Sequence, residues 1–468
     1  MLHVHAFTDD CLGELDAVGV AQSIAAGEIS PTEAAKAALA RIDVVEPTLG
    51  AVAYDDRERA LARAATGDFG GAFAGVPSLI KNNTQFEGIP TLYGSAAPAV
   101  VPAAANEPVA DELVATGLNI LGATTMPAFG LTATTEFADR APTRNPWNTD
   151  FSSGASSGGA AALVASGAVP IAHGNDGGGS IRIPAAACGL VGLKPTRGRV
   201  AQSAQMKGMP IDLVSNGVLT RTVRDTAHYF ADLERQRRVD SLPPIGLVEG
   251  PGTKRLRVAM LNAPLTGRLL DADTSRALDA TVELLESLGH RVTTIPMPID
   301  RAYINQFTDY WALMAFGIER LGAQSIGKGF DRSKVDPFTK GLSSRFMKRF
   351  YRLPSSIMGL KRANKAFHAI FDNFDVVLSP TLAHAVPEIG HLDPSGDFDE
   401  IFARLIDYVA FTPANNTSGG PAITVPLGQG SNGVPVGIHF SSGLGDERTL
   451  LELAFELEAA KPFARIQD

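Results

Sequence analysis

Cysteine is scarce in this sequence, and the pattern typical of a catalytic zinc site is missing. Cys11 and Cys188 are the only cysteines among 468 residues, which excludes a disulfide framework as the basis of the fold. The nine histidines form nothing like HExxH, in which two histidines one helical turn apart bind zinc. A protein of a reducing compartment, the cytoplasm, fits this composition best.

An excess of positive charge and long apolar runs are lacking as well. The chain has 41 Lys and Arg against 50 Asp and Glu, a net charge of -9, whereas nucleic-acid-binding surfaces are basic. Apolar runs such as AALVASGAVPIA are interrupted by glycine and are much shorter than the ~20 residues of a membrane-spanning helix. The start, MLHVHAFTDD, has neither the basic nor the apolar region of a signal peptide. We expect a soluble protein whose partners include neither nucleic acid nor a membrane.

Hydrophobic residues, at 45%, are abundant enough to form a large core, and their spacing alternates between strand and helix patterns. Ser30-Pro31-Thr32-Glu33 is typical of a helix start, with a capping box and proline at the first helical position. The remaining expected elements are a helix after Gly158-Gly159, a strand at VPIAH (169–173), a strand–helix–strand unit at 256–295, a strand at 374–381 and a last helix at 446–460. The pattern predicts an α/β fold with covered sheet faces, and 233–257 is the best candidate for an exposed connection.

Three consecutive glycines precede a serine in HGNDGGGSIRIP (173–184). Adjacent glycines let successive backbone N–H groups converge on one anion, either a phosphate or an oxyanion. Phosphate loops follow GxxxxGK[ST] or GxGxxG, and no lysine follows Gly179. A flexible linker is disfavoured because the apolar segment SIRIPAAACGLVGL continues the stretch. The pattern favours a serine at a strand end beside its own oxyanion hole.

Such a serine needs a base to take its proton. His173, His384 and His439 are candidates, although a structural role is the simpler interpretation of each. Lys81 follows the apolar run in FAGVPSLIKNN (73–83), and burial there would lower the pKa of its amine from about 10.4 towards neutrality. Alone, that lysine would be interpreted as a surface charge, and GASSGG (154–159) as a Ser/Gly turn.

The order of these three stretches resembles the amidase signature family of hydrolases. GVPSLIKNN is followed by GASSGG and then by GNDGGGSIRIPAAACGLVGLKPTRGR, while TRNPWN (143–148), DVVLSPT and NNTSGGPAITVPLG (415–428) are similar to further landmarks of the family. The resemblance implies one α/β/α domain over residues 1–468, in three layers around a large mixed sheet. Its expected regions are an N-terminal helical part (1–70), a catalytic core (71–230) and a variable helical segment that forms the substrate pocket (301–370).

The same resemblance implies a Ser-Ser-Lys triad in place of Ser-His-Asp. Ser180 would be the nucleophile, Ser156 a proton relay that follows an unusual cis peptide, and Lys81 the base. The N–H groups of Gly177, Gly178, Gly179 and Ser180 would form the oxyanion hole, and Ser157, Asp176 and Arg182 would support the site. Three features depart from the family pattern. Asn82 replaces an acidic residue, Ala155 replaces a glycine, and ATTMPA (123–128) occupies the place where members often have KTN before a Met-x-Glu-like segment.

The activity implied is hydrolysis of a carboxylic amide to an acid and an amine or ammonia through an acyl-serine, with no metal or other cofactor. The expected partner is a small-molecule amide, and a homodimer is one oligomeric state that we consider. The expected pocket residues are Thr125, Met126 and Phe129, from a segment that often lines the pocket in the family, and Tyr310, Trp311 and Phe316, which could equally pack a helix onto the sheet. Two alternatives stay open: the A subunit of a tRNA-dependent glutamine amidotransferase, and a binding protein with a degenerate site.

Overall fold

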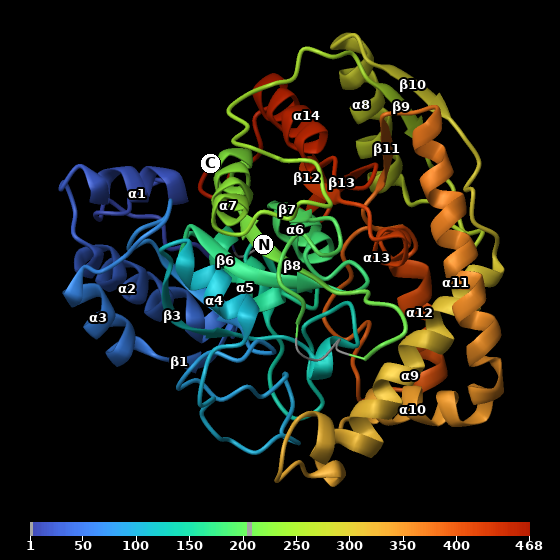
Figure 1. Ribbon diagram of the computed structural model, residues 1–468, viewed down its shortest axis with the longest axis horizontal. Coiled ribbons are helices and arrows are strands. Elements are labelled where there is room, and N and C mark those ends of the chain that lie inside the picture. Colours follow the sequence, from blue (N-terminus) through green and yellow to red (C-terminus); the bar gives the residue numbers. More distant parts are fainter. Residues whose placement is uncertain (1–2, 204–207) are drawn as a thin grey trace.

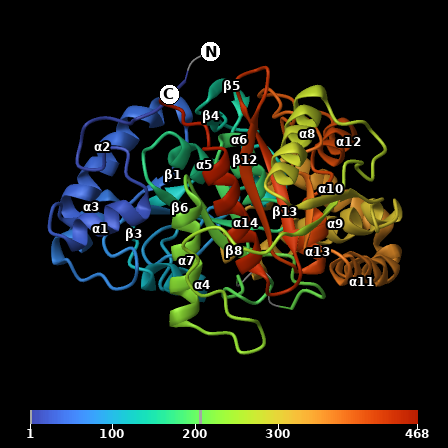
Figure 2. The ribbon, with the colours of Figure 1, turned by 90° about the horizontal axis from the view of Figure 1, so that it is seen from above.

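A computed structural model describes residues 3–203 and 208–468 and contains one large and two small sheets (Figures 1 and 2). The large sheet has eight strands in the order β10-β9-β11-β13-β12-β7-β8-β6. Strand β9 runs parallel to β10 and β11, and the other neighbouring pairs are antiparallel. Its strands are β6 (Ile171–Asp176), β7 (Val191–Lys194), β8 (Ser215–Thr220), β9 (Arg257–Met260), β10 (Arg291–Thr294), β11 (Val376–Pro380), β12 (Ala422–Gln429) and β13 (Pro435–Ser442).

The predicted α/β fold with a large mixed sheet surrounded by helices is confirmed. Helices that pack on this sheet are α5 (Gly158–Ala165), α6 (Arg182–Cys188), α7 (Val223–Gln236), α8 (Ala272–Ser287) and α14 (Glu447–Ala460). Close packing depends on small residues: a Cβ at Gly437 of β13 would lie 2.4 Å from Ala186 Cβ of α6. One hydrophobic core joins most of this sheet to these helices, while Ala259 of β9 and Val377 of β11 belong to a second apolar cluster.

A three-stranded sheet lies against the edge of the large one. It comprises β1 (Val52–Asp55), β3 (Asn119–Thr124) and β2 (Pro77–Lys81), with β3 in the centre. Strand β2 is the edge strand of the small sheet and contacts β6, the edge strand of the large one. The remaining strands, β4 (Arg144–Asn145) and β5 (Asn148–Ser152), form a separate hairpin.

Helices flank the sheets at both ends of the molecule. On one side lie α1 (Ala17–Ala25), α2 (Pro31–Leu49) and α3 (Arg57–Thr66), and on the other α9 (Ala302–Ser325), α10 (Pro337–Arg349) and α11 (Leu353–His368), as Figures 1 and 2 show. The residues that the structure describes also form the short helices α4 (Pro108–Ala115), α12 (Phe398–Tyr408) and α13 (Pro413–Ser418), and one-turn 3₁₀ segments at Ala128–Gly130, Arg332–Lys334, Phe350–Arg352 and Ala369–Asp372.

Local patterns predicted these elements well. At the start of α2 both bonds of the capping box form, since Ser30 Oγ accepts from Glu33 N–H and the Glu33 carboxylate accepts from Ser30 N–H. The strand expected before the glycines is β6, and the strand–helix–strand unit is β9-α8-β10 with parallel strands. Within the described residues, no helix is long and apolar enough to cross a membrane, and no cluster of His, Cys, Asp or Glu could hold a metal ion.

Candidate active site

Lys81 is the last residue of β2, and its side chain is completely buried. Its Nζ lies 2.7 Å from Ser156 Oγ and 2.7 Å from Asn175 Oδ1 at the end of β6. Burial lowers the pKa of this amine from 10.5 to about 7, against the opposing effect of Asp176. A substantial fraction of Lys81 is therefore neutral near pH 7 and can accept a proton.

Ser156 and Ser157 lie just before α5, and the Ala155–Ser156 peptide bond is cis, as the resemblance implied. Ser157 N–H donates to the carbonyl of Ser180 at 3.2 Å, which joins the serine pair to the glycine loop. Ser156 and Ser180 line the same cavity. No hydrogen bond joins their hydroxyls in the part of the chain that the structure describes, and such contacts often tighten only when substrate binds.

The glycine loop connects β6 to α6. Gly179 has φ +131°, and a Cβ there would lie 2.4 Å from Thr412 Oγ1, so only glycine fits. Gly179 N–H donates to Asp176 Oδ1 at 2.7 Å, and this bond fixes the shape of the loop. The N–H groups of Gly177, Gly178 and Ser180 donate to no other described residue and remain available to a ligand.

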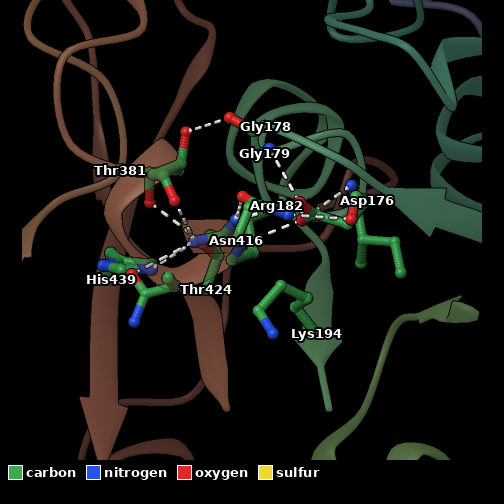
Figure 3. A network of polar contacts seen from close by, with 12 residues as sticks. Asp176, Gly178, Gly179, Arg182, Lys194, Thr381, Asn416, Thr424 and His439 are labelled. Carbon is green, nitrogen blue, oxygen red and sulfur yellow. Dashed lines mark hydrogen bonds and ion pairs between the residues drawn. The ribbon is translucent and has the colours of Figure 1, made fainter. Parts of the chain in front are cut away.

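A buried network holds this loop from below (Figure 3). Arg182 forms a completely buried ion pair with Asp176, with Nε 2.8 Å from Oδ2. Asn416 donates to the Asp176 carbonyl at 2.8 Å and accepts from Arg182 Nη2 at 2.7 Å. Arg182 holds the pKa of the Asp176 carboxyl well below its usual range despite the burial, so this carboxylate stays charged. Lys194 lies beside the network, and burial together with Arg182 lowers its pKa to about 7.

The histidines occupy other places. His173 Nδ1 accepts from the backbone N–H of Lys81, and burial lowers the pKa of its imidazole to about 3. His439 lies 3.0 Å from Arg182 Nη1, and His384 contacts the carbonyl of Ala385. None of the three bonds to Ser180 in the described residues, so the geometry does not favour a Ser-His pair.

A cavity of about 650 Å³ opens at Ser156 and Ser180. Of the expected pocket residues, Phe129, Trp311 and Phe316 line it. Phe129 and Tyr93 both have a left-handed backbone conformation (φ +54° and +53°), which residues other than glycine rarely adopt. Their rings are stacked, with 6.5 Å between the ring centroids.

Thr125, Met126 and Tyr310 do not line this cavity. Tyr310 of α9 is completely buried, and its hydroxyl bonds to both the N–H and the carbonyl of Ile211. The Thr125 hydroxyl lies 2.8 Å from that of Thr143, and Met126 is completely buried. Of the two interpretations that the sequence left open for Tyr310, packing of the helix holds and lining of the pocket does not.

Sequence reasoning missed Asn175, Thr412 and Asn416. Asn175 bonds to Lys81, Thr412 Oγ1 donates to the Gly178 carbonyl at 2.7 Å, and Asn416 joins the network under the loop. Asn175 precedes Asp176 directly, and Asn416 lies in a landmark that the resemblance had singled out, so both positions carried a signal. Thr412 carried none, because only the folded chain brings it to the glycines.

Comparisons with known proteins agree with this architecture. A family model described as Amidase matches residues 33–451. The chain is 43% identical to the putative amidase AmiC of Mycobacterium tuberculosis, over 100% of this chain and 98% of the relative. It is 32% identical to the 6-aminohexanoate-cyclic-dimer hydrolase of Paenarthrobacter ureafaciens, over 96% of this chain and 95% of the relative. A solved structure of 6-aminohexanoate cyclic dimer hydrolase complexed with substrate superposes with a TM-score of 0.87 at 29% identity, covering 97% and 98% of the two chains.

The fold is an α/β architecture in which a buried lysine, two serines and a glycine loop meet at one cavity. The chain belongs to the amidase family, as the order of its sequence motifs predicted.

Proposed function

We propose that this protein hydrolyses carboxylic amides to an acid and an amine or ammonia, with Ser180 as nucleophile. The observation that carries the proposal is the distance of 2.7 Å between Lys81 Nζ and Ser156 Oγ, on the wall of the cavity that Ser180 also lines. The names of the relatives, amidase, acylamidase and cyclic-dimer hydrolase, support this class of reaction.

In the acylation step, Ser180 Oγ attacks the amide carbonyl carbon. Its proton passes to Ser156 Oγ as the Ser156 proton passes to neutral Lys81 Nζ. The C–N bond then breaks, the leaving nitrogen receives a proton back along the same path, and the acyl group remains as an ester on Ser180. Water repeats the sequence to release the acid and regenerate Ser180.

Negative charge develops on the carbonyl oxygen in both steps. The N–H groups of Gly177, Gly178 and Ser180 are the donors we assign to it, while Gly179 N–H stays with Asp176. Loss of one such donor costs about 3 to 4 kcal/mol in other hydrolases. No step of this path calls for a metal or an organic cofactor, so we expect chelators to leave the activity unchanged.

Two alternatives remain testable. A glutamine amidotransferase subunit would release ammonia from glutamine and co-purify with partner subunits. A degenerate binding protein would not react at Ser180, although the lysine and both serines are present here and Lys81 contacts Ser156.

The test combines active-site labelling with turnover. A fluorophosphonate should label the native protein and fail to label Ser180→Ala, which should still bind substrate without turning it over. A panel of aryl, alkyl and cyclic amides, with glutamine as a separate arm, identifies the substrate by release of ammonia or amine. Labelling of Ser180→Ala at the native rate would refute the assignment of the nucleophile.

A further inference from the structure

Helix α9 forms one long wall of the cavity, to which it contributes twelve residues. Five apolar ones among them, Ile304, Phe307, Trp311, Met314 and Ile318, repeat every three or four positions, which places them on one face of the helix. At a rise of about 1.5 Å per residue this face extends for about 21 Å, and the helix kinks beyond it at Leu321.

The N-terminal part of this face lies at the glycine loop, because a Cβ at Gly178 would be 3.7 Å from Phe307 Cζ. Beyond the other end of the face, the cavity-lining residues Leu321 and Ser325 are exposed. The cavity therefore leads from the candidate catalytic centre along α9 towards the surface, with Leu405 and Ile406 of α12 adding further apolar contacts.

No Asp, Glu, Lys, Arg or His is among the described residues that line the cavity. The two carboxylates of α9 are engaged elsewhere. Asp309 pairs with Arg349 at 2.7 Å and accepts from Ser356, while Glu319 accepts from Arg332 and Ser343, each at 2.7 Å. Lys81 does not line the cavity and is completely buried, although it bonds to Ser156 and Asn175, which do line it.

From these observations we infer that the substrate is an electrically neutral amide whose acyl group is apolar and lies along the α9 face. The inference rests on the proposed function and specifies its substrate class. A charged group that enters an apolar cavity without a charged partner loses its hydration, at a cost of several kcal/mol. The same argument disfavours glutamine, which carries an ammonium and a carboxylate.

The test compares primary amides of matched length: heptanamide, 6-aminohexanamide, in which an ammonium replaces the terminal methyl, and adipic acid monoamide, which ends in a carboxylate. Ammonia release by the native enzyme gives kcat/KM for each. We expect heptanamide to be preferred over either charged analogue by at least about thirtyfold, or about 2 kcal/mol. A smaller preference, or a reversed one, overturns the inference.

A pair of variants tests the α9 face itself. Met314→Glu introduces a carboxylate on the cavity wall, and Met314→Gln is the neutral control of the same length. Relative to the Gln variant, the Glu variant should shift the ratio of kcat/KM for 6-aminohexanamide over heptanamide upwards at least tenfold. Propionamide, a short neutral substrate, reports whether each variant retains its catalytic centre. An unchanged ratio in a variant that hydrolyses propionamide contradicts the placement of the acyl group.

Failure of the proposed function looks different. If the native enzyme hydrolyses none of these amides and Ser180 resists labelling, the proposed function is wrong and the inference with it. Hydrolysis without the charge preference removes the inference alone.

Discussion

Lys81 and Lys194 are two completely buried lysines with the same lowered pKa, but the structure gives them different neighbours. Lys81 Nζ reaches Ser156 Oγ, whereas Lys194 Nζ donates to the carbonyl of Pro195. Burial lowers the pKa of each to about 7. In the proposed mechanism only Lys81, which lies beside a hydroxyl of the cavity, transfers a proton to and from the substrate.

The first prediction concerns activity and pH. The base must be neutral, so kcat/KM should rise as pH passes through about 7 and then level off, since more Lys81 is deprotonated above its pKa. Lys81→Arg should lose activity by several orders of magnitude, because a guanidinium does not release its proton. Near-native turnover of Lys81→Arg with an unchanged pH profile would show that the lysine is only a structural charge.

The second prediction concerns stability and pH. Between pH 7 and 10.5 each buried lysine is neutral when folded and protonated when unfolded, so the unfolded state binds more protons and the free energy of unfolding rises with pH. Each lysine contributes up to about 1.4 kcal/mol per pH unit in this window. Lys81→Met should remove one of the two contributions to this slope, as measured by urea unfolding at pH 7.5, 8.5 and 9.5. An unchanged slope would mean that Lys81 stays charged in the folded protein.

At the scale of elements, the loop between β6 and α6 is set by the conformation of one glycine. Gly179 has φ +131°, and a Cβ there would also approach Ile183 Cδ1 to 2.7 Å. At Gly178 the nearest atom to a Cβ would be Phe307 Cζ at 3.7 Å, an ordinary contact. A methyl group would therefore clash with its neighbours at Gly179 and fit without a clash at Gly178.

The third prediction follows from this difference. Gly179→Ala should misplace the donors of the loop and lower kcat/KM at least about a hundredfold, in the range seen when an oxyanion donor is lost. Gly178→Ala keeps its N–H and should stay within about tenfold of the native enzyme. Fluorophosphonate labelling rates provide the measurement. Equal losses in the two variants would contradict the structural distinction.

Elements and site differ in how far the sequence predicts them. Strand β6 and helices α2 and α5 followed from local signals, because a capping box or an apolar run is contained in a few residues. The proposed triad was implied by the family resemblance, which depends on the order of the motifs and not on any single one. Thr412 escaped prediction because its contact with Gly178 spans more than two hundred residues. For Tyr310 the sequence left a cavity position and a core position open, because an aromatic residue on a helix can face either.

At the scale of the whole molecule, the N-terminal helices are joined to the core by a buried carboxylate. Asp225 of α7 accepts from the N–H groups of Ala17 and Val18 at the start of α1, each at 2.9 Å. Arg224 pairs with Asp16 beside it. These contacts link residues about two hundred positions apart and support the prediction that residues 1–468 form one domain, which still needs a test.

The fourth prediction provides that test. Asp225→Ala leaves two buried N–H groups without an acceptor, at a cost of about 1 to 3 kcal/mol each. If the chain is one domain, thermal unfolding should remain a single transition at a lower Tm, whether followed by fluorescence or by loss of Ser180 labelling. Asp225→Asn, which keeps one acceptor oxygen, should be less destabilised. Two separate transitions would show that the N-terminal region unfolds independently.

Lys81 and Ser180 come from different sheets: the lysine ends β2 of the small sheet, and the serine follows β6 of the large one. Neither sheet alone holds a complete proton path. During refolding, labelling of Ser180 should therefore return only after the two sheets have docked, later than the secondary structure of either. Pairings between such distant segments form slowly, because the chain must close a long loop before they stabilise it. We therefore expect a partly folded chain, in which the two sheets have not yet docked, to carry no reactive serine.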